Sequence, residues 1–349
     1  MKVVSFFSGA GGLDLGFQKA GYDIVWANEF DKEIWSTYEF NHPDTVLDRR
    51  SIVDVQSKEV PDCEGIIGGP PCQSWSAAGS HKGIDDKRGK LFFDFIRILE
   101  DKQPTFFLAE NVSGILAPRH SNALKNIISS FEGAGYNVVY KLLNAKDFNV
   151  PQDRKRVIFI GYNKNKTNNR VFKFPKINNS VVALEDVIWD LKDNAIPALD
   201  KNYSNLDSCN ILNHEYFIGS YSTIYMSRNR VRTWEEQSFT IQAGARHAPI
   251  HPNAPKMIKL EKDKQIFAPG FENLYRRLSV RECARIQTFP DDFKFIYTKV
   301  AAGYKMIGNA VPVNMAYSLA MMVKEDLESM TKLNNERVIL RENKIDINL

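Results

Sequence analysis

The chain has 349 residues, enough to bury a large core, and this length favours two domains over one. Its net charge of +4 and its pI near 8.7 are only mildly basic, so whole-chain charge does not establish a nucleic-acid partner. The 4 cysteines form no CxxC pair, which argues against a metal site or a disulfide scaffold and predicts a reducing, cytoplasmic compartment. We predict neither a cleavable leader nor an apolar run long enough to span a membrane, and therefore no membrane partner.

The N-terminal segment has the pattern of a nucleotide-binding βαβ unit. A β-favouring run at residues 3–7 meets a glycine loop at residues 8–12, and helical spacing follows. A second apolar run ends in Glu29, where an acid can hydrogen-bond ribose hydroxyls. Asp14 replaces the third glycine of the strict dinucleotide fingerprint, so the loop favours an adenosine-bearing cofactor more than a dinucleotide. A glycine turn without a ligand stays open as the alternative.

Apolar runs and helical patterns continue to alternate as far as Gly161, which predicts an α/β fold with a Rossmann-like sheet. Strands are expected at residues 65–67, 106–109, 136–143 and 157–160, and helices at residues 13–20, 34–40, 90–99 and 121–131. We place the first domain at residues 1–177, a smaller and more irregular domain at 178–298, and a return to the first domain at 299–330. Residues 331–349 are predicted to form a polar tail.

Residues 66–76 read Ile-Ile-Gly-Gly-Pro-Pro-Cys-Gln-Ser-Trp-Ser. The apolar run predicts a buried strand, and the glycines and prolines force a sharp turn after it. Because prolines stiffen such a loop, the Cys72 thiol is held in place, as a nucleophile requires. On this stretch alone, a small buried cysteine beside a structural turn is an equal alternative.

Three further polar side chains adjoin predicted strands. Glu110 follows an apolar run, at the sheet edge where ligands bind in open α/β folds, and is a candidate general acid. A solvated loop carboxylate is the alternative. Arg154 and Arg156 lie at positions i and i+2 entering a strand, so we expect them on one face, where they could hold an anionic backbone or a base edge. A solvated basic pair is the alternative reading.

Arginine is concentrated in the irregular region. Arg228, Arg230 and Arg232 alternate along the chain, and Arg246 lies in a glycine-bearing loop. Arginine reads the O6 and N7 atoms of guanine through two hydrogen bonds in the major groove. An exposed edge strand with charged side chains is the alternative. Further along, residues 275–285 predict a helix with a Ser N-cap and a basic face.

Six motifs occur in the order found in DNA cytosine-5 methyltransferases. They are Phe-Ser-Gly-Ala-Gly-Gly at 7–12, Pro-Pro-Cys-Gln at 70–73, Glu-Asn-Val at 110–112, Gln-Asp-Arg-Lys-Arg at 152–156, the segment 277–290 and Gly-Asn-Ala-Val-Pro at 308–312. From about residue 2 to residue 323 the chain therefore resembles this family. The segment from residue 213 through Trp234 also resembles the bacterial HaeIII-type enzyme that modifies GGCC.

The resemblance implies an S-adenosylmethionine-dependent methyltransferase fold with a target-recognition domain, which methylates C5 of a cytosine in a restriction–modification system. Cys72 would add to C6 of a cytosine flipped out of the duplex, and Glu110 would assist as a protonated carboxyl at N3. Arg154 and Arg156 would hold the base O2 and a neighbouring phosphate. The residues implied to bind S-adenosylmethionine are Phe7, Gly9, Gly11, Leu13, Glu29, Pro70, Leu91, Asn309 and Val311.

The implied partner is double-stranded DNA, with guanine contacts from Arg228, Arg230, Arg232 and Arg246. One active site per chain predicts a working monomer with no obligate protein partner, and leaves room for a cognate restriction endonuclease acting on the same site. A transfer-RNA cytosine methyltransferase shares the catalytic set and is the nearest alternative. A catalytically silent DNA-binding regulator and an NAD dehydrogenase are the other two alternative functions.

Overall fold

The computed structural model describes the backbone of residues 1–71, 87–174 and 181–345, and the side chains of residues 1–71, 91–174 and 181–330. Cys72, the predicted nucleophile, lies outside the described residues. The strands of the described part are β1 Lys2–Phe6, β2 Asp23–Asn28, β3 Val46–Asp48, β4 Gly65–Gly68, β5 Phe106–Val112, β6 Tyr136–Asn144, β7 Lys155–Asn163, β8 Ile196–Pro197, β9 Glu215–Tyr216, β10 Ile258–Glu261 and β11 Lys264–Ile266. Its helices are α1 Gly12–Lys19, α2 Trp35–Asn41, α3 Lys87–Lys102, α4 Ser121–Gly133, α5 Glu185–Ile188, α6 Val280–Ile286, α7 Val300–Asn309 and α8 Val313–Ile345.

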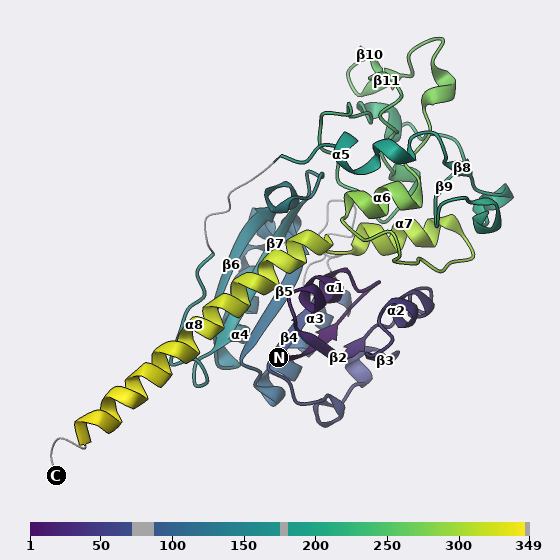
Figure 1. Cartoon of the computed structure of the whole chain (residues 1–349). Helices are drawn as coiled ribbons and strands as arrows, with labels where there is room; N and C mark the ends of the chain where they lie inside the picture. The colour runs from purple at the N-terminus through teal and green to yellow at the C-terminus, as the bar shows by residue number, and fades with distance from the viewer. Residues whose placement is uncertain (72–86, 175–180, 346–349) are drawn as a thin grey trace.

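A seven-stranded sheet in the order β3-β2-β1-β4-β5-β7-β6 forms the centre of the fold (Figure 1). The strands from β3 to β5 are parallel, and β7 runs antiparallel to both of its neighbours. The chain moves outward from β1 to β2 and β3 on one side and from β4 to β5 on the other. The carboxyl ends of β1 and β4 therefore form the switch point at which open α/β sheets bind ligands. The predicted α/β class and Rossmann-like sheet are confirmed.

Two helical layers cover the sheet. Helices α1 and α8 pack on one face, where Phe17 and Leu319 are fully buried. Helices α3 and α4 pack on the other face, which buries Phe95 and Phe131. Removing each such side chain from water contributes about 1.5–3 kcal/mol to folding. Helices α1 and α8 approach closely at Gly16, where an added Cβ would lie 2.4 Å from the Ala316 Cβ.

The prediction that no segment is apolar enough to span a membrane needs correction. The segment Val300–Met330 is long and apolar enough by length and composition, and 67% of its most apolar window is buried inside the structure. Val313, Ala316 and Leu319 in this segment are buried against the rest of the protein. Contact with the core explains the apolar composition of this segment.

The second half of the chain is mostly irregular, as predicted, but three of its elements differ from the sequence reading. The predicted helix over residues 275–285 begins only at Val280, after the Ser279 cap, and its basic face is wrong in part because Arg281 is fully buried. Arg281 instead donates to the carbonyls of residues 212, 290 and 293. Helix α7 was not predicted, and the backbone of α8 continues through the expected tail to Ile345.

Candidate active site

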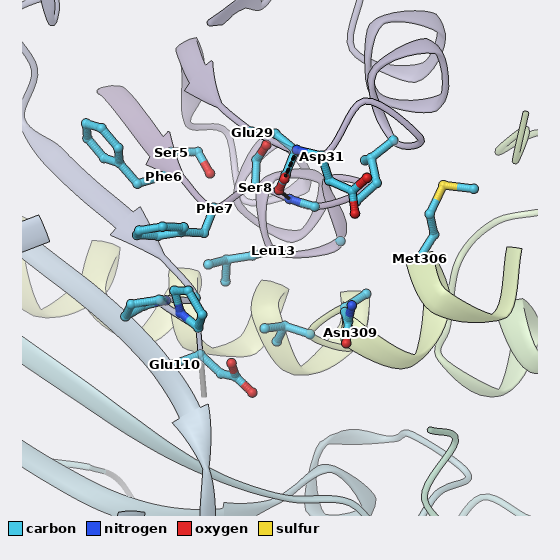
Figure 2. A pocket seen from close by; sticks show the side chains of 18 of the residues that line it. Ser5, Phe6, Phe7, Ser8, Leu13, Glu29, Asp31, Glu110, Met306 and Asn309 are labelled. Carbon is cyan, nitrogen blue, oxygen red and sulfur yellow. Dashed lines mark hydrogen bonds between the residues drawn. The ribbon is translucent and has the colours of Figure 1, made fainter. Parts of the chain in front are cut away.

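A cavity of about 260 Å³ lies at the switch point between β1 and β4 (Figure 2). Its walls come from the glycine loop after β1, the end of β2, the Gly-Pro-Pro turn after β4, the end of β5 and residues 306–311. The predicted cofactor residues on this wall are Phe7, Gly9, Leu13, Glu29, Pro70, Asn309 and Val311. Segments distant in sequence therefore meet at one site because the strand order brings their ends together.

Glu29 follows β2 and supplies a fixed acceptor at one end of the cavity. Its Oε2 accepts from the Gly9 N–H at 2.9 Å, and its Oε1 accepts from the Asp31 N–H at 2.8 Å. Burial raises the pKa of Glu29 above its usual value, although the two backbone bonds act in the opposite direction. The carboxylate is thus oriented by the chain on both sides of it, and the cavity is open to its remaining acceptor positions.

The loop between β1 and α1 is shaped by unusual backbone conformations. Phe7 has a φ of 54° and Gly9 a φ of 55°, in the left-handed region where non-glycine residues are uncommon. At Gly12 an added Cβ would lie 2.7 Å from the Val311 carbonyl oxygen, so only glycine allows the loop to meet the segment before α8. The Ser8 hydroxyl is buried at the cavity wall and has no hydrogen-bond partner within the described part of the chain.

Glu110 lies on the opposite side of the cavity from Glu29 (Figure 2). It is inside β5, not after it, and its Oε1 is 2.6 Å from the Nε of Arg156 on the paired strand β7. Both side chains are mostly buried and both line the cavity. Asn111 donates to the Pro70 carbonyl at 3.3 Å, which ties β5 to the Pro-Pro turn. The residue after Pro71 is Cys72, which lies beyond the described part of the loop.

The geometry corrects the prediction for Arg154. This side chain has 0% exposure and does not line the cavity. Its Nη1 donates to the Ile241 carbonyl at 3.0 Å, and its Nη2 donates to the carbonyls of Gly308 and Ala310 at 2.9 Å. Arg154 therefore ties the irregular region to the α7–α8 junction, and a base contact from this position is not supported.

Gly11 and Leu91 are the two predicted cofactor residues that the structure places away from the cavity wall. Gly11 caps α1 with a φ of 85°, and an added Cβ there would lie 2.1 Å from the His42 ring. Leu91 begins the described side chains of α3, is partly buried, and packs against the core on the sheet face that α3 and α4 cover. Both residues therefore adjoin packed side chains, and a cofactor contact from either position is not supported by the cavity lining.

Comparisons with known proteins decide the family. The family model described as C-5 cytosine-specific DNA methylase matches residues 1–325. The chain belongs to this family. It is 57% identical over 337 residues to the Type II methyltransferase M.FnuDI of Fusobacterium nucleatum, an alignment that covers 96% of this chain and 98% of that one. It is 55% identical over 333 residues to M.NgoPII of Neisseria gonorrhoeae, covering 94% and 96% of the two chains.

Solved structures support the fold independently. A crystal structure of Spodoptera frugiperda DNMT2 superposes with a TM-score of 0.64 at 19% identity, over 92% of this chain and 98% of that one. A prophage-encoded protein from E. coli, described as a DNA modification methyltransferase, gives a TM-score of 0.71 at 24% identity, over 94% and 99%. The predicted methyltransferase fold and the predicted DNA cytosine-5 methyltransferase activity are confirmed.

Membership of this family implies S-adenosylmethionine as the methyl donor, and the cavity residues fit such a ligand. Glu29 offers acceptors for hydroxyls, the Ser8 hydroxyl is unsatisfied, and the side chains of Phe7, Leu13 and Val311 supply apolar walls. Asp31 and Met306 also line the cavity and were missed. Met306 was missed because α7 was not predicted. The only sequence signal for Asp31 was an acidic side chain close to Glu29.

The four arginines of the methyltransferase that were predicted to contact guanine separate into three environments. Arg228 and Arg230 line a second hollow of about 220 Å³. Arg232 does not line it, because its Nη1 donates to Glu236 at 3.0 Å and its guanidinium lies 4.1 Å from the centre of the Phe239 ring. Arg246 is exposed and lines a neighbouring depression beside Lys299. A guanine contact from Arg232 therefore loses support.

Asp14, under the glycine loop, forms a buried polar cluster. It is 0% exposed and accepts hydrogen bonds from Ser5 Oγ and Tyr38 Oη, each at 2.6 Å. Burial raises its pKa to about 6, although these two bonds act in the opposite direction. A carboxyl whose folded pKa exceeds its unfolded value stabilises the fold most at low pH, and this stability is lost as the pH rises through the folded pKa.

Asp14→Asn should therefore remove this part of the pH dependence of the free energy of unfolding. Between about pH 4 and pH 6 we expect wild type to lose up to about 3 kcal/mol relative to the variant. Urea unfolding at intervals from pH 4 to pH 7 measures this difference. Asp44→Asn, at an exposed aspartate, is the control and should parallel wild type. Parallel profiles for wild type and Asp14→Asn would show that Asp14 is charged throughout this range.

Proposed function

We propose that this enzyme methylates C5 of a cytosine flipped out of a short duplex DNA site, through a transient bond between the Cys72 sulfur and the base C6. The observation that carries the proposal is the facing arrangement of Glu110 and Arg156 on one wall of the cavity and the glycine loop on the other. The Pro-Pro turn that leads to Cys72 also lines this cavity. The cavity thus adjoins a carboxyl, a guanidinium and the turn before a cysteine.

Each residue has a defined part in this chemistry. The Cys72 thiolate forms a bond to C6 while a proton moves from the Glu110 carboxyl to N3, which converts the ring to an enamine. C5 then forms a bond to the methyl carbon of the sulfonium donor, whose carbon–sulfur bond breaks with its electrons on sulfur. Removal of the C5 proton by a base, which water can serve as, expels the thiolate and restores the ring. Arg156 orients Glu110 through their ion pair, and its guanidinium would also meet the base O2 or its phosphate.

The target site we propose is GGCC, read by the irregular region. This rests on the resemblance of residues 213–234 to the HaeIII-type enzyme and on Arg228 and Arg230 sharing one hollow. Arg246, exposed nearby, is a third candidate for a DNA contact. We further propose that residues 178–298 act as the target-recognition domain of a monomeric, cytoplasmic modification enzyme. The Type II names of the relatives support a role in restriction–modification.

Methylation assays with matched substrates test this function. We expect methyl incorporation from S-adenosylmethionine into a duplex containing GGCC, and none into the same duplex with the site scrambled or into a transfer RNA. A duplex with 5-fluorocytosine at the target should give an adduct that survives denaturation with wild type but not with Cys72→Ala, because fluorine at C5 blocks the last proton removal. Incorporation into transfer RNA alone would favour the RNA enzyme, and an adduct with Cys72→Ala would exclude Cys72 as the nucleophile.

A further inference from the structure

Arg230 is a buried guanidinium without a counter-ion in the described residues. It is 7% exposed, and no carboxylate of residues 1–71, 91–174 or 181–330 lies within 4.0 Å of it. Burial lowers its pKa, and the nearby charge of Arg228 acts in the same direction. A buried charge is costly unless it is paired. The hollow that it lines is therefore suited to a ligand that offers hydrogen-bond acceptors.

The backbone already uses one edge of this guanidinium. Nε donates to the Tyr225 carbonyl at 2.8 Å, and Nη2 donates to the Ile224 carbonyl at 3.0 Å. These two N–H groups form the side edge of the planar group. The terminal edge, made by Nη1 and the second hydrogen of Nη2, has no hydrogen-bond partner among the residues that the structure describes. Two donors at this spacing match the O6 and N7 acceptors of guanine.

The Tyr225 ring fixes the plane of the same guanidinium. The Arg230 Cζ lies 4.6 Å from the ring centre, and the Arg277 Cζ lies 5.6 Å from it. Tyr225 is 1% exposed, and its hydroxyl donates to the Ala248 carbonyl at 2.7 Å. The ring therefore cannot turn away, and it favours a cation close to its face.

The other arginines of the region are not held in this way. Arg228 and Arg246 are exposed, so each must lose side-chain freedom on binding. Arg232 is committed to Glu236. Arg230 alone among these four combines burial, a fixed side edge and an open terminal edge.

We propose that Tyr225 is a positioning residue for target recognition, which holds Arg230 so that its terminal edge reads the O6/N7 edge of one guanine. The proposal rests on the proposed DNA site-specific activity but not on the identity of the site as GGCC. Tyr225 acts through its ring face and its main-chain carbonyl, and it does not touch the base itself.

A coupling experiment between protein and DNA tests this role. The site is first identified by bisulfite sequencing of DNA from cells that express the full chain. Each guanine of that site is then replaced singly by 7-deazaguanine, which removes the N7 acceptor, and kcat/KM is measured for wild type, Arg230→Ala, Tyr225→Leu and Tyr225→Phe. For wild type we expect one replacement to lower kcat/KM by about 10-fold.

Supporting and opposing outcomes are distinct. The decrease in kcat/KM caused by 7-deazaguanine is the guanine penalty. We expect this penalty to fall to about 2-fold or less in Arg230→Ala and Tyr225→Leu, and to persist in Tyr225→Phe, which keeps the ring. Tyr203→Leu, at a tyrosine whose ring centre lies 4.9 Å from the Lys299 Nζ, is the matched control and should keep the full penalty. An undiminished penalty in Tyr225→Leu, or in Arg230→Ala, overturns the proposal.

Thermal unfolding and S-adenosylmethionine binding show whether the variants fold. If Tyr225→Leu does not, pentafluorophenylalanine at position 225 keeps the shape of the ring but reverses its electrostatic face. The guanine penalty should then fall below that of Tyr225→Phe, and an equal penalty overturns the ring's role. Absence of any site-specific methylation by wild type would instead refute the proposed function, so the two failures are distinguishable.

Discussion

Glu110→Gln should lower kcat for methyl transfer by about 10²- to 10⁴-fold, the usual contribution of a positioned general acid. The amide has the shape of the carboxyl and still offers Arg156 an acceptor, but it cannot donate an acidic proton to the base N3. The affinity for S-adenosylmethionine should change little, because Glu29 and the glycine loop lie on the other side of the cavity. Single-turnover methylation with saturating DNA measures the rate, and equilibrium dialysis measures the cofactor affinity.

The control for this variant is Glu39→Gln, which neutralises another glutamate paired with an arginine. The Arg49 Nη2 lies 2.5 Å from the Glu39 Oε1, and both side chains are half exposed to solvent. Such surface pairs contribute little, so rate and affinity should both stay at the wild-type level. A Glu110→Gln enzyme with an unchanged rate would remove Glu110 from the chemistry and leave Arg156 as the group that stabilises the developing charge.

Local patterns allowed much of the fold and 9 of the 21 residues that line the cavity to be predicted from sequence. Buried parallel strands read as apolar runs, so β1, β4 and β5 were found, and the ligand edge followed from what comes after each. The glycine loop and Glu29 were found because both belong to one short βαβ unit. The ligand-binding edge could be predicted without knowing the strand order, since the carboxyl ends of all parallel strands lie at the same edge of the sheet.

Residues whose environment depends on distant segments could not be predicted in this way. Arg154 and Arg156 are the same residue type two positions apart, so the sequence placed them on one face. Arg154 instead donates to carbonyls 87 or more residues away in the chain, whereas Arg156 pairs with Glu110. Arg281 was likewise read as part of a basic face, although it is buried against three carbonyls from other segments. Charge predicts exposure only where no distant acceptors are available, and periodicity does not report those acceptors.

Glu282→Gln should produce the largest loss of stability among the variants considered, about 3–5 kcal/mol at pH 7. Glu282 is fully buried, accepts from the Ser279 N–H at 2.7 Å as part of a capping box, and pairs with both Nη atoms of Arg276 at 2.7 and 2.8 Å. Burial alone would raise its pKa, but Arg276 and then His251 lower it to about 2. The amide keeps the cap and leaves Arg276 with an uncompensated charge, and this charge is the source of the loss.

The pH dependence separates this charge effect from a packing effect. A carboxyl whose folded pKa is depressed stabilises the fold above its unfolded pKa near 4.5, and that stability is lost as the pH falls through about 2. The difference between wild type and Glu282→Gln in urea unfolding should therefore be full at pH 7 and shrink below about pH 4.5. Glu272→Gln, at an exposed glutamate that accepts from the Gly270 N–H, should stay within about 0.5 kcal/mol of wild type. A deficit for Glu282→Gln that does not change with pH would assign the loss to packing, whereas recovery of stability in the Arg276→Met, Glu282→Gln double variant would confirm the unpaired guanidinium as its cause.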